Sequence, residues 1–309
     1  MSDTCKVTDG PVRSASARCV YSVLPEPLQC GRFTLSFERP LVMGILNVTP
    51  DSFSDGGKFA LRDEALRHAE QMLREGTDLI DIGGESTRPG ASPVSPDEEL
   101  ERVLPVLERL RDAPVPLSID TSRPYVLRYV LAAGADMIND IRGFRMPGAV
   151  DAVRSSACGL CVMHMLGEPR TMQGGAIAYD DVVANVRQFL DARVMALQGA
   201  GIAKARICVD PGFGFGKAVI EHNYALLAHL PQIAPPAVQP YPVLVGLSRK
   251  AMLGAVVGRT VTQRLAASIA AAVCAAQRGA AIIRVHDVAQ TVDALKVWQA
   301  VREAGQVQD

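Results

Sequence analysis

The chain has 309 residues, of which 48% are hydrophobic and 21% are charged, so it can bury a sizeable core and is neither disordered nor fibrous. Its formal net charge of −1 provides no overall basic field to attract nucleic acid or an anionic membrane, so we expect neither as a partner. An anionic ligand must instead meet local positive charge, which favours a small-molecule substrate. The seven cysteines, and a first segment without the basic and apolar order of a secretory signal, predict a cytoplasmic location.

The first 39 residues do not show the regular spacing of apolar positions that marks helices and strands. They are rich in Ser, Pro and Arg, and we expect a partly ordered N-terminal extension over residues 1–39. A short hairpin is expected around residues 30–37. Residues 40–309 are predicted to form a single domain.

Eight short apolar runs, rich in β-branched residues, follow the extension and predict β-strands. The runs begin at Leu41, Asp78, Pro116, Met137, Gly159, Arg206, Pro242 and Ala281. The stretches between them carry helical periodicity, and one opens at Ser95 with the Ser-x-x-Glu pattern of a capping box. Strands that are apolar throughout suit a parallel sheet covered on both faces, and eight strand–helix units predict an α/β fold, the (β/α)8 TIM barrel. A doubly wound open sheet is the alternative.

Three segments carry weaker signals. The glycine-rich residues 212–217 lack the Walker spacing and are followed by Ala218 instead of a magnesium-binding Ser or Thr, so we interpret them as a flexible loop. Cys158 and Cys161 have the spacing of a redox pair but enter an apolar strand, which favours a structural role. The alanine-rich residues 265–281 are too weakly apolar to span a bilayer and predict a buried helix.

Nearly every predicted strand ends in a residue able to do chemistry. These residues are Asn47, the segment 85–88, Asp120, Asn139, His164, Asp210, Lys250, Arg284 and His286. The carboxyl ends of barrel strands share one mouth, and barrel enzymes place their catalytic groups there. The polar residues at the carboxyl ends of the predicted strands therefore predict an active site at the mouth of the barrel.

The side-chain types in this set indicate what the mouth binds. The carboxylates of Asp120 and Asp210 and the amide of Asn139 can accept parallel hydrogen bonds from the N–H edge of a planar heterocycle. Positive charge for an anionic group is offered by the basic residues of the set, Lys250, Arg284 and His286. Asn47 offers a neutral oxygen of the sort that hard cations accept. Lys250 could alternatively form a Schiff base with a carbonyl substrate, as in barrel aldolases.

Two loops are longer than a barrel turn requires. One begins at Thr49 after the first predicted strand and the other at Gly83 after the second, and both mix Gly, Pro, Ser and Asp. Loops of this kind often act as lids, so Phe53 and Arg88 within them could close over a ligand.

Seven motifs, in order along the chain, resemble those of the dihydropteroate synthase family. They are MGILNVTPDSFSDGG from Met43, DIGGESTRPGA from Asp81, SIDT from Ser118, NDI from Asn139, DPGFGFGK from Asp210, GLSRK from Gly246 and RVHD from Arg284. The resemblance implies a (β/α)8-barrel transferase of folate biosynthesis. Such an enzyme joins 6-hydroxymethyl-7,8-dihydropterin diphosphate to 4-aminobenzoate and releases pyrophosphate with the help of Mg²⁺.

The resemblance also implies roles position by position. The pterin would contact Asp120, Asn139, Met163, Asp210, Gly246 and Lys250. The diphosphate would lie at Asn47, Thr87, Arg284 and His286, with Asn47 near the metal. The 4-aminobenzoate would contact Arg88, Pro89, Phe215 and Ser248, and a first mobile loop would contain Asp51, Ser52 and Phe53. The catalytic set would be Asp120, Asp210, Lys250, Arg284 and His286.

The chemistry implied by the resemblance favours ionisation over direct attack, because an electron-rich dihydropterin can stabilise a cation at its methylene carbon.

Two other functions stay open. A methyltetrahydrofolate-dependent methyltransferase would share the pterin-binding barrel but has no pyrophosphate to hold, and a non-catalytic pterin-binding protein would lack turnover. The resemblance further implies a homodimer that packs through late helices such as residues 263–276.

Overall fold

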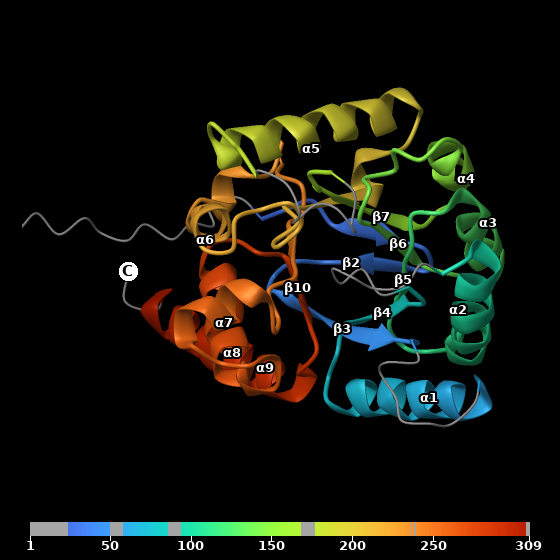
Figure 1. Cartoon of the computed structure of the whole chain (residues 1–309), viewed down its shortest axis with the longest axis horizontal. Helices are drawn as coiled ribbons and strands as arrows, with labels where there is room; N and C mark the ends of the chain where they lie inside the picture. The colour runs from blue at the N-terminus through green and yellow to red at the C-terminus, as the bar shows by residue number, and fades with distance from the viewer. Residues whose placement is uncertain are drawn as a thin grey trace, which may run out of the picture.

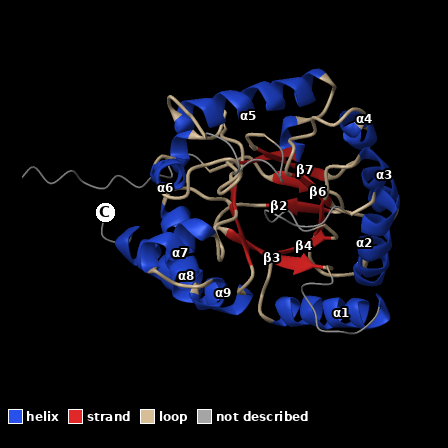
Figure 2. Ribbon diagram, in the orientation of Figure 1, coloured by secondary structure: helices blue, strands red, loops and turns tan. Residues whose placement is uncertain are grey.

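The computed structural model describes residues 24–49, 58–85, 94–167, 177–235, 237 and 239–306, which form a parallel barrel inside a ring of helices (Figure 1, Figure 2). Within these residues the barrel strands are β3 (Leu41–Asn47), β4 (Leu79–Gly83), β5 (Leu117–Asp120), β6 (Met137–Asp140), β7 (Gly159–Met163), β8 (Ile207–Asp210), β9 (Leu244–Val245) and β10 (Ile282–Val285). A hairpin of β1 (Leu28–Cys30) and β2 (Phe33–Leu35) precedes them.

The eight barrel strands pair in parallel in the order β8-β7-β6-β5-β4-β3-β10-β9. Val209 of β8 forms a further parallel bridge with Val243, and its N–H donates to the carbonyl of Pro242 at 2.9 Å. These contacts join the two ends of the sheet, so the predicted (β/α)8 barrel is confirmed. Because the strands all run in the same direction, their carboxyl ends lie at one mouth.

The helices lie outside the strands (Figure 2). They are α1 (Lys58–Arg74), α2 (Pro96–Leu110), α3 (Pro124–Ala132), α4 (Ala149–Arg154), α5 (Val182–Gly199), α6 (Glu221–Ala228), α7 (Ala251–Val257), α8 (Leu265–Gln277) and α9 (Val288–Gln306). The predicted cap is present in α2, where Ser95 Oγ accepts the N–H of Glu98 at 3.1 Å and satisfies an amide of the first turn. The Glu98 carboxylate accepts from Arg102 one turn later at 2.5 Å.

The hairpin closes the amino-terminal end of the barrel. Leu28 and Cys30 pack with Met43, Leu79 and Met137 in one buried apolar cluster, which separates this end from the mouth. The short hairpin predicted near residues 30–37 is therefore present at residues 28–35. The division of the chain at residue 39 stays a prediction.

Two further sequence predictions can be compared with the structure, one for the strand β9 and one for the helix α8. The apolar run from Pro242 was expected to form a full strand, but β9 pairs with β10 only at Leu244 and Val245. Proline has no N–H to donate to a neighbouring strand, which shortens the ladder at that end. The helix predicted to be buried is α8, which is buried along one face only: Ala271 and Ala275 are buried, whereas Leu265 at its start is exposed. In the described segments, no helix has both the length and the apolar character needed to cross a membrane.

Candidate active site

The strand register brings several of the predicted polar residues to one level at the mouth. Asn47 pairs with Gly83, Gly83 with Asp120, and Asp120 with Asn139, across the neighbouring strands β3 to β6. A Cβ added at Gly83 would lie 3.6 Å from Asn47 Oδ1 and 3.7 Å from Asp120 Cβ. Gly83 therefore lies between the Asn47 and Asp120 side chains, at ordinary contact distance from both.

Arg284 joins two carboxylates across the mouth. Its Nε donates to Asp81 Oδ2 at 2.6 Å and its Nη2 donates to Asp120 Oδ2 at 3.0 Å. Asn139 Nδ2 also donates to Asp81 Oδ2, at 3.0 Å. The other side-chain oxygens of Asp81 and Asn139 are buried, and no described group donates to them. Buried acceptors of this kind are costly to leave unpaired, which suits a ligand that brings N–H donors.

The pKa values of this cluster show how its charges are balanced. Burial raises the pKa of Asp120 to about 7, although the positive charge of Arg284 opposes the shift. Burial disfavours the charged form of Arg284, but the carboxylates of Asp81 and Asp120 outweigh this effect and raise its pKa above the ordinary value. Arg284 therefore keeps its charge, while Asp120 titrates near neutral pH.

Lys250 and Asp210 form a second pair of opposite charges at the mouth. Burial raises the pKa of Asp210, and the positive charge of Lys250 opposes this shift. Burial lowers the pKa of Lys250 to about 8, with the charge of Asp210 acting in the other direction. The N–H of Gly212 donates to Asp210 Oδ1 at 2.7 Å, which fixes that carboxylate at the end of β8.

The wall around Lys250 is aromatic and apolar. Its Nζ lies 4.9 Å from the centroid of the Phe215 ring and donates to the carbonyl of Phe213. Phe215 packs against a small buried cluster that contains Met163. A Cβ added at Gly246 would lie 3.8 Å from Lys250 Nζ, so the glycine keeps the space beside the ammonium free of a side chain. A flat ring could stack in such a slot.

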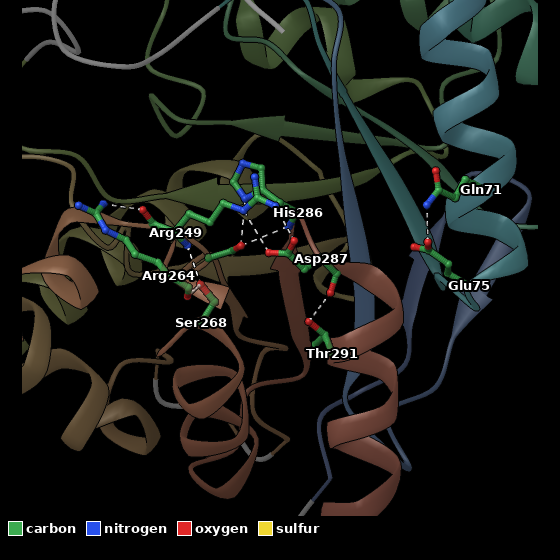
Figure 3. A network of polar contacts seen from close by, with 9 residues as sticks. Gln71, Glu75, Arg249, Arg264, Ser268, His286, Asp287 and Thr291 are labelled. Atoms are coloured by element: carbon green, nitrogen blue, oxygen red, sulfur yellow. Dashed lines mark hydrogen bonds and ion pairs between the residues drawn. The ribbon is translucent and has the colours of Figure 1, made fainter. Parts of the chain in front are cut away.

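His286 and Ser248 contact each other where β9 and β10 end. His286 Nδ1 and Ser248 Oγ are 2.9 Å apart, and the backbone N–H of His286 donates to the same hydroxyl at 3.3 Å. Figure 3 shows His286 within a network that continues through the neighbouring residue Asp287. The structure thus brings Asn47, Asp120, Asn139, Met163, Asp210, Phe215, Gly246, Ser248, Lys250, Arg284 and His286 to the carboxyl-terminal side of the barrel.

Six predicted site residues lie outside the described residues. They are Asp51, Ser52 and Phe53 of the first long loop and Thr87, Arg88 and Pro89 of the second. Their predicted contacts with the diphosphate and the 4-aminobenzoate stay predictions.

Sequence reasoning gave no role to two charged residues that the structure places in this region. Asp81 is fully buried and holds both Arg284 and Asn139. Its position inside the apolar run of β4 was a usable signal, because a carboxylate there must face the barrel interior when Ile80 and Ile82 pack outward.

The second such residue is Lys217, which is completely buried beneath the loop after β8. Its Nζ donates to the carbonyls of Gly212 and Phe215 at 2.8 and 3.1 Å and lies 3.0 Å from His164 Nδ1. Burial lowers the pKa of Lys217 to about 7 and that of His164 to about 2. The loop of residues 212–217, which the sequence predicted to be flexible, is therefore held by hydrogen bonds from the buried Lys217 ammonium. His164 contacts the same ammonium and so supports this loop beneath the mouth.

A closed parallel barrel with acids, bases and an apolar slot at its carboxyl-terminal mouth is the architecture of a (β/α)8-barrel enzyme acting on a small polar ligand. Comparison with known proteins narrows this class. A family model described as pterin binding enzyme matches residues 43–286. A dihydropteroate synthase from Neisseria meningitidis serogroup C is 49% identical over 277 residues, which cover 88% of this chain and 96% of that protein.

Two solved structures agree with this match. The crystal structure of Burkholderia cenocepacia dihydropteroate synthase complexed with 7,8-dihydropteroate is 64% identical, with a TM-score of 0.86 over 92% of this chain and 99% of that one. The Xanthomonas albilineans dihydropteroate synthase with 4-aminobenzoic acid is 52% identical, with a TM-score of 0.83 over 90% and 98% of the two chains. The chain belongs to the family of pterin binding enzymes and, within it, to the dihydropteroate synthases.

Proposed function

We propose that this chain condenses 6-hydroxymethyl-7,8-dihydropterin diphosphate with 4-aminobenzoate, giving 7,8-dihydropteroate and pyrophosphate. The observation that carries this function is the Asp81–Arg284–Asp120 cluster, which sets a guanidinium beside buried carboxylates at a mouth that also has an apolar slot. The relatives solved with 7,8-dihydropteroate and with 4-aminobenzoic acid support the two small-molecule substrates.

The pterin lies, in this proposal, against the acceptors of the mouth. The carboxylate of Asp210 can accept two parallel hydrogen bonds from the amidine-like edge of the ring. The Asn139 oxygen, to which no described group donates a hydrogen bond, offers a further buried acceptor. Lys250 approaches the ring from the side of Phe215 and can donate to a ring acceptor.

The difficult step is departure of the diphosphate. The bond between the methylene carbon and the diphosphate oxygen breaks, and its electron pair leaves with pyrophosphate. Arg284 and His286 would stabilise negative charge growing on the leaving group, while ionised Asp120 and Asp210 would stabilise positive charge growing on the pterin. The amine nitrogen of 4-aminobenzoate, held near Phe215 and Ser248, then forms the new carbon–nitrogen bond and loses one proton.

Mg²⁺ is the cofactor that we propose for this reaction. Asn47 ends β3, and its amide oxygen lies beside Gly83 at the mouth, so a neutral oxygen donor is present there. The described segments contain no cluster of three or more His, Cys, Asp or Glu side chains that could hold a metal ion by themselves. This donor set fits Mg²⁺, which keeps several waters and takes other ligands from substrate phosphates. When bound, the ion would neutralise charge on the diphosphate, and Asn47 would help to hold it there.

We also propose a homodimer and a cytoplasmic location. The exposed apolar residues Val256 and Val257 of α7, Val261 and Leu265 lie close together in sequence. Leu265 belongs to residues 263–276, the helix expected to pack against a second copy, and the other three residues precede it. Light scattering of the purified protein tests this: a dimer that becomes a monomer in Val261→Asp supports the proposed face.

Reducing conditions in the cytoplasm suit the unpaired thiols of the described cysteines.

Product analysis tests the function directly. The purified chain, given the pterin diphosphate, 4-aminobenzoate and Mg²⁺, should form 7,8-dihydropteroate and pyrophosphate in equal amounts. Methyl transfer from methyltetrahydrofolate without pyrophosphate release would favour the methyltransferase. Tight pterin binding without turnover would favour a non-catalytic binding protein.

A further inference from the structure

Arg249 lies between Ser248 and Lys250, two residues of the mouth, and its backbone is left-handed. Its φ is +59°, and among the described residues only Phe144 shares a positive φ without being glycine. A residue with a Cβ adopts this conformation at a cost in free energy, so surrounding contacts must hold it there.

The side chain of Arg249 is held by Asp287, the residue after His286 (Figure 3). Its Nε donates to Asp287 Oδ2 at 3.1 Å and its Nη2 donates to Asp287 Oδ1 at 2.5 Å. A two-bond contact between guanidinium and carboxylate fixes orientation as well as distance. Together with the Ser248–His286 contact, it joins two consecutive residues after β9 to two consecutive residues after β10.

The peptide groups of Arg249 are held by the beginning of α8. Its N–H donates to Ser268 Oγ at 2.9 Å, and its carbonyl accepts from Arg264 Nη1 at 2.9 Å. The Arg264 guanidinium passes so close to Gly254 in α7 that a Cβ at this position would clash with it. Both sides of the strained residue are therefore fixed by groups from another element.

We propose that Arg249 is a positioning residue, whose ion pair with Asp287 holds the left-handed backbone that directs Ser248 and Lys250 into the mouth. This inference rests on the proposed function, because it takes Ser248 and Lys250 to contact the two substrates. Arg249 itself touches no substrate in this arrangement. Its charge acts on Asp287, and its effect on the reaction passes through the backbone.

Two substitutions separate the backbone effect from the charge. Arg249→Met removes the ion pair but keeps a Cβ and the backbone contacts with Ser268 and Arg264. The left-handed conformation then loses the support of the Arg249 side chain, and kcat/KM should fall at least tenfold. Arg249→Gly also removes the charge, but glycine adopts a positive φ without steric cost, so kcat/KM should stay within about threefold of wild type. Binding of 7,8-dihydropteroate, measured by titration calorimetry, should follow the same order and needs no turnover.

Arg39→Met is the matched control. Arg39 and Asp78 form a similar two-bond ion pair at 2.6 and 2.8 Å, at the opposite end of the barrel. The side-chain exposures are also alike, 47% and 18% for this pair and 40% and 15% for Arg249 and Asp287. The control should match Arg249→Met in thermal stability and keep the wild-type kcat/KM.

Two results would overturn the inference. Arg249→Gly as impaired as Arg249→Met would mean that the charge acts directly on a substrate, and a fully active Arg249→Met would mean that the backbone needs no such support. Wild-type turnover, measured alongside, tests the proposed function separately.

Discussion

Asp210 is the carboxylate that the proposed function uses to grip the pterin. It is buried at the end of β8, and one of its oxygens accepts the N–H of Gly212. In Asp210→Asn an acceptor oxygen becomes a donor facing the N–H edge of the ring, so pterin binding should weaken by about 3 kcal/mol or more. Titration calorimetry measures this loss. The exposed Asp151→Asn on α4 serves as the control, and an Asp210→Asn protein that binds within about twofold of wild type would refute the assignment.

His164 makes the fold sensitive to acid. Burial, with the charge of Lys217 as a second cause, lowers its pKa from 6.5 to about 2 in the folded protein. Below pH 6.5 the His164 side chain therefore binds a proton in the unfolded chain but not in the folded protein. The contribution of His164 to the free energy of unfolding is present above pH 6.5 and is lost as the pH falls. At pH 5 the loss is about 2 kcal/mol for this one group.

Urea unfolding at pH 7 and pH 5 tests this effect. His164→Gln keeps an acceptor for Lys217 but does not titrate, so the wild type should lose about 2 kcal/mol more than the variant between the two pH values. Equal losses in the two proteins would show that His164 is not buried in a neutral form.

Residues were predictable from sequence where their role follows from their place in one strand. Asp120 and Asp210 each end an apolar run, so their position at the mouth follows from the barrel alone. The role of Asp81 depends on Arg284, which lies 203 positions away, and the role of Arg249 depends on a backbone angle and on Asp287. One-dimensional patterns do not contain such pairings.

The elements were predictable to different degrees. Strands such as β3 and β7, which are buried along their whole length, are marked by unbroken apolar runs. The two-residue strand β9 was overestimated, because the pattern of its side chains does not reveal which backbone groups find a partner. The hairpin of β1 and β2 was found, but its packing under the barrel was not, since three-residue strands carry too little periodicity to show a buried face.

The hairpin supplies a prediction at the scale of elements. Leu28 is almost completely buried in the cluster at the amino-terminal end of the barrel, far along the strands from the mouth. Leu28→Ala should lower the free energy of unfolding by about 2–5 kcal/mol and leave kcat and KM unchanged. Leu24 lies in the same segment but is exposed, so Leu24→Ala should change stability by less than about 0.5 kcal/mol. An active-site defect in a folded Leu28→Ala protein would contradict this separation of the two ends.

At the scale of the whole molecule, the barrel separates stability from chemistry. The apolar plug lies at one end of the strands, and the charged groups lie at the other. Within the mouth, Arg284 lies in β10 and His286 directly follows that strand. Asp120 and Asp210 are the last residues of β5 and β8. In the proposed function, the groups that would stabilise the leaving pyrophosphate and those that would stabilise the pterin thus come from different strands around one opening.

The central claim is that pyrophosphate departs before the amine attacks, and positional isotope exchange tests it most directly. The pterin diphosphate is labelled with oxygen-18 at the oxygen that joins the methylene carbon to phosphorus and is incubated with the enzyme and Mg²⁺ without 4-aminobenzoate. If the carbon–oxygen bond opens reversibly at the mouth, the label moves to non-bridging positions of recovered substrate, and Arg284→Met suppresses the exchange. A label that stays entirely in the bridge of an enzyme that turns over normally once 4-aminobenzoate is added would contradict the account.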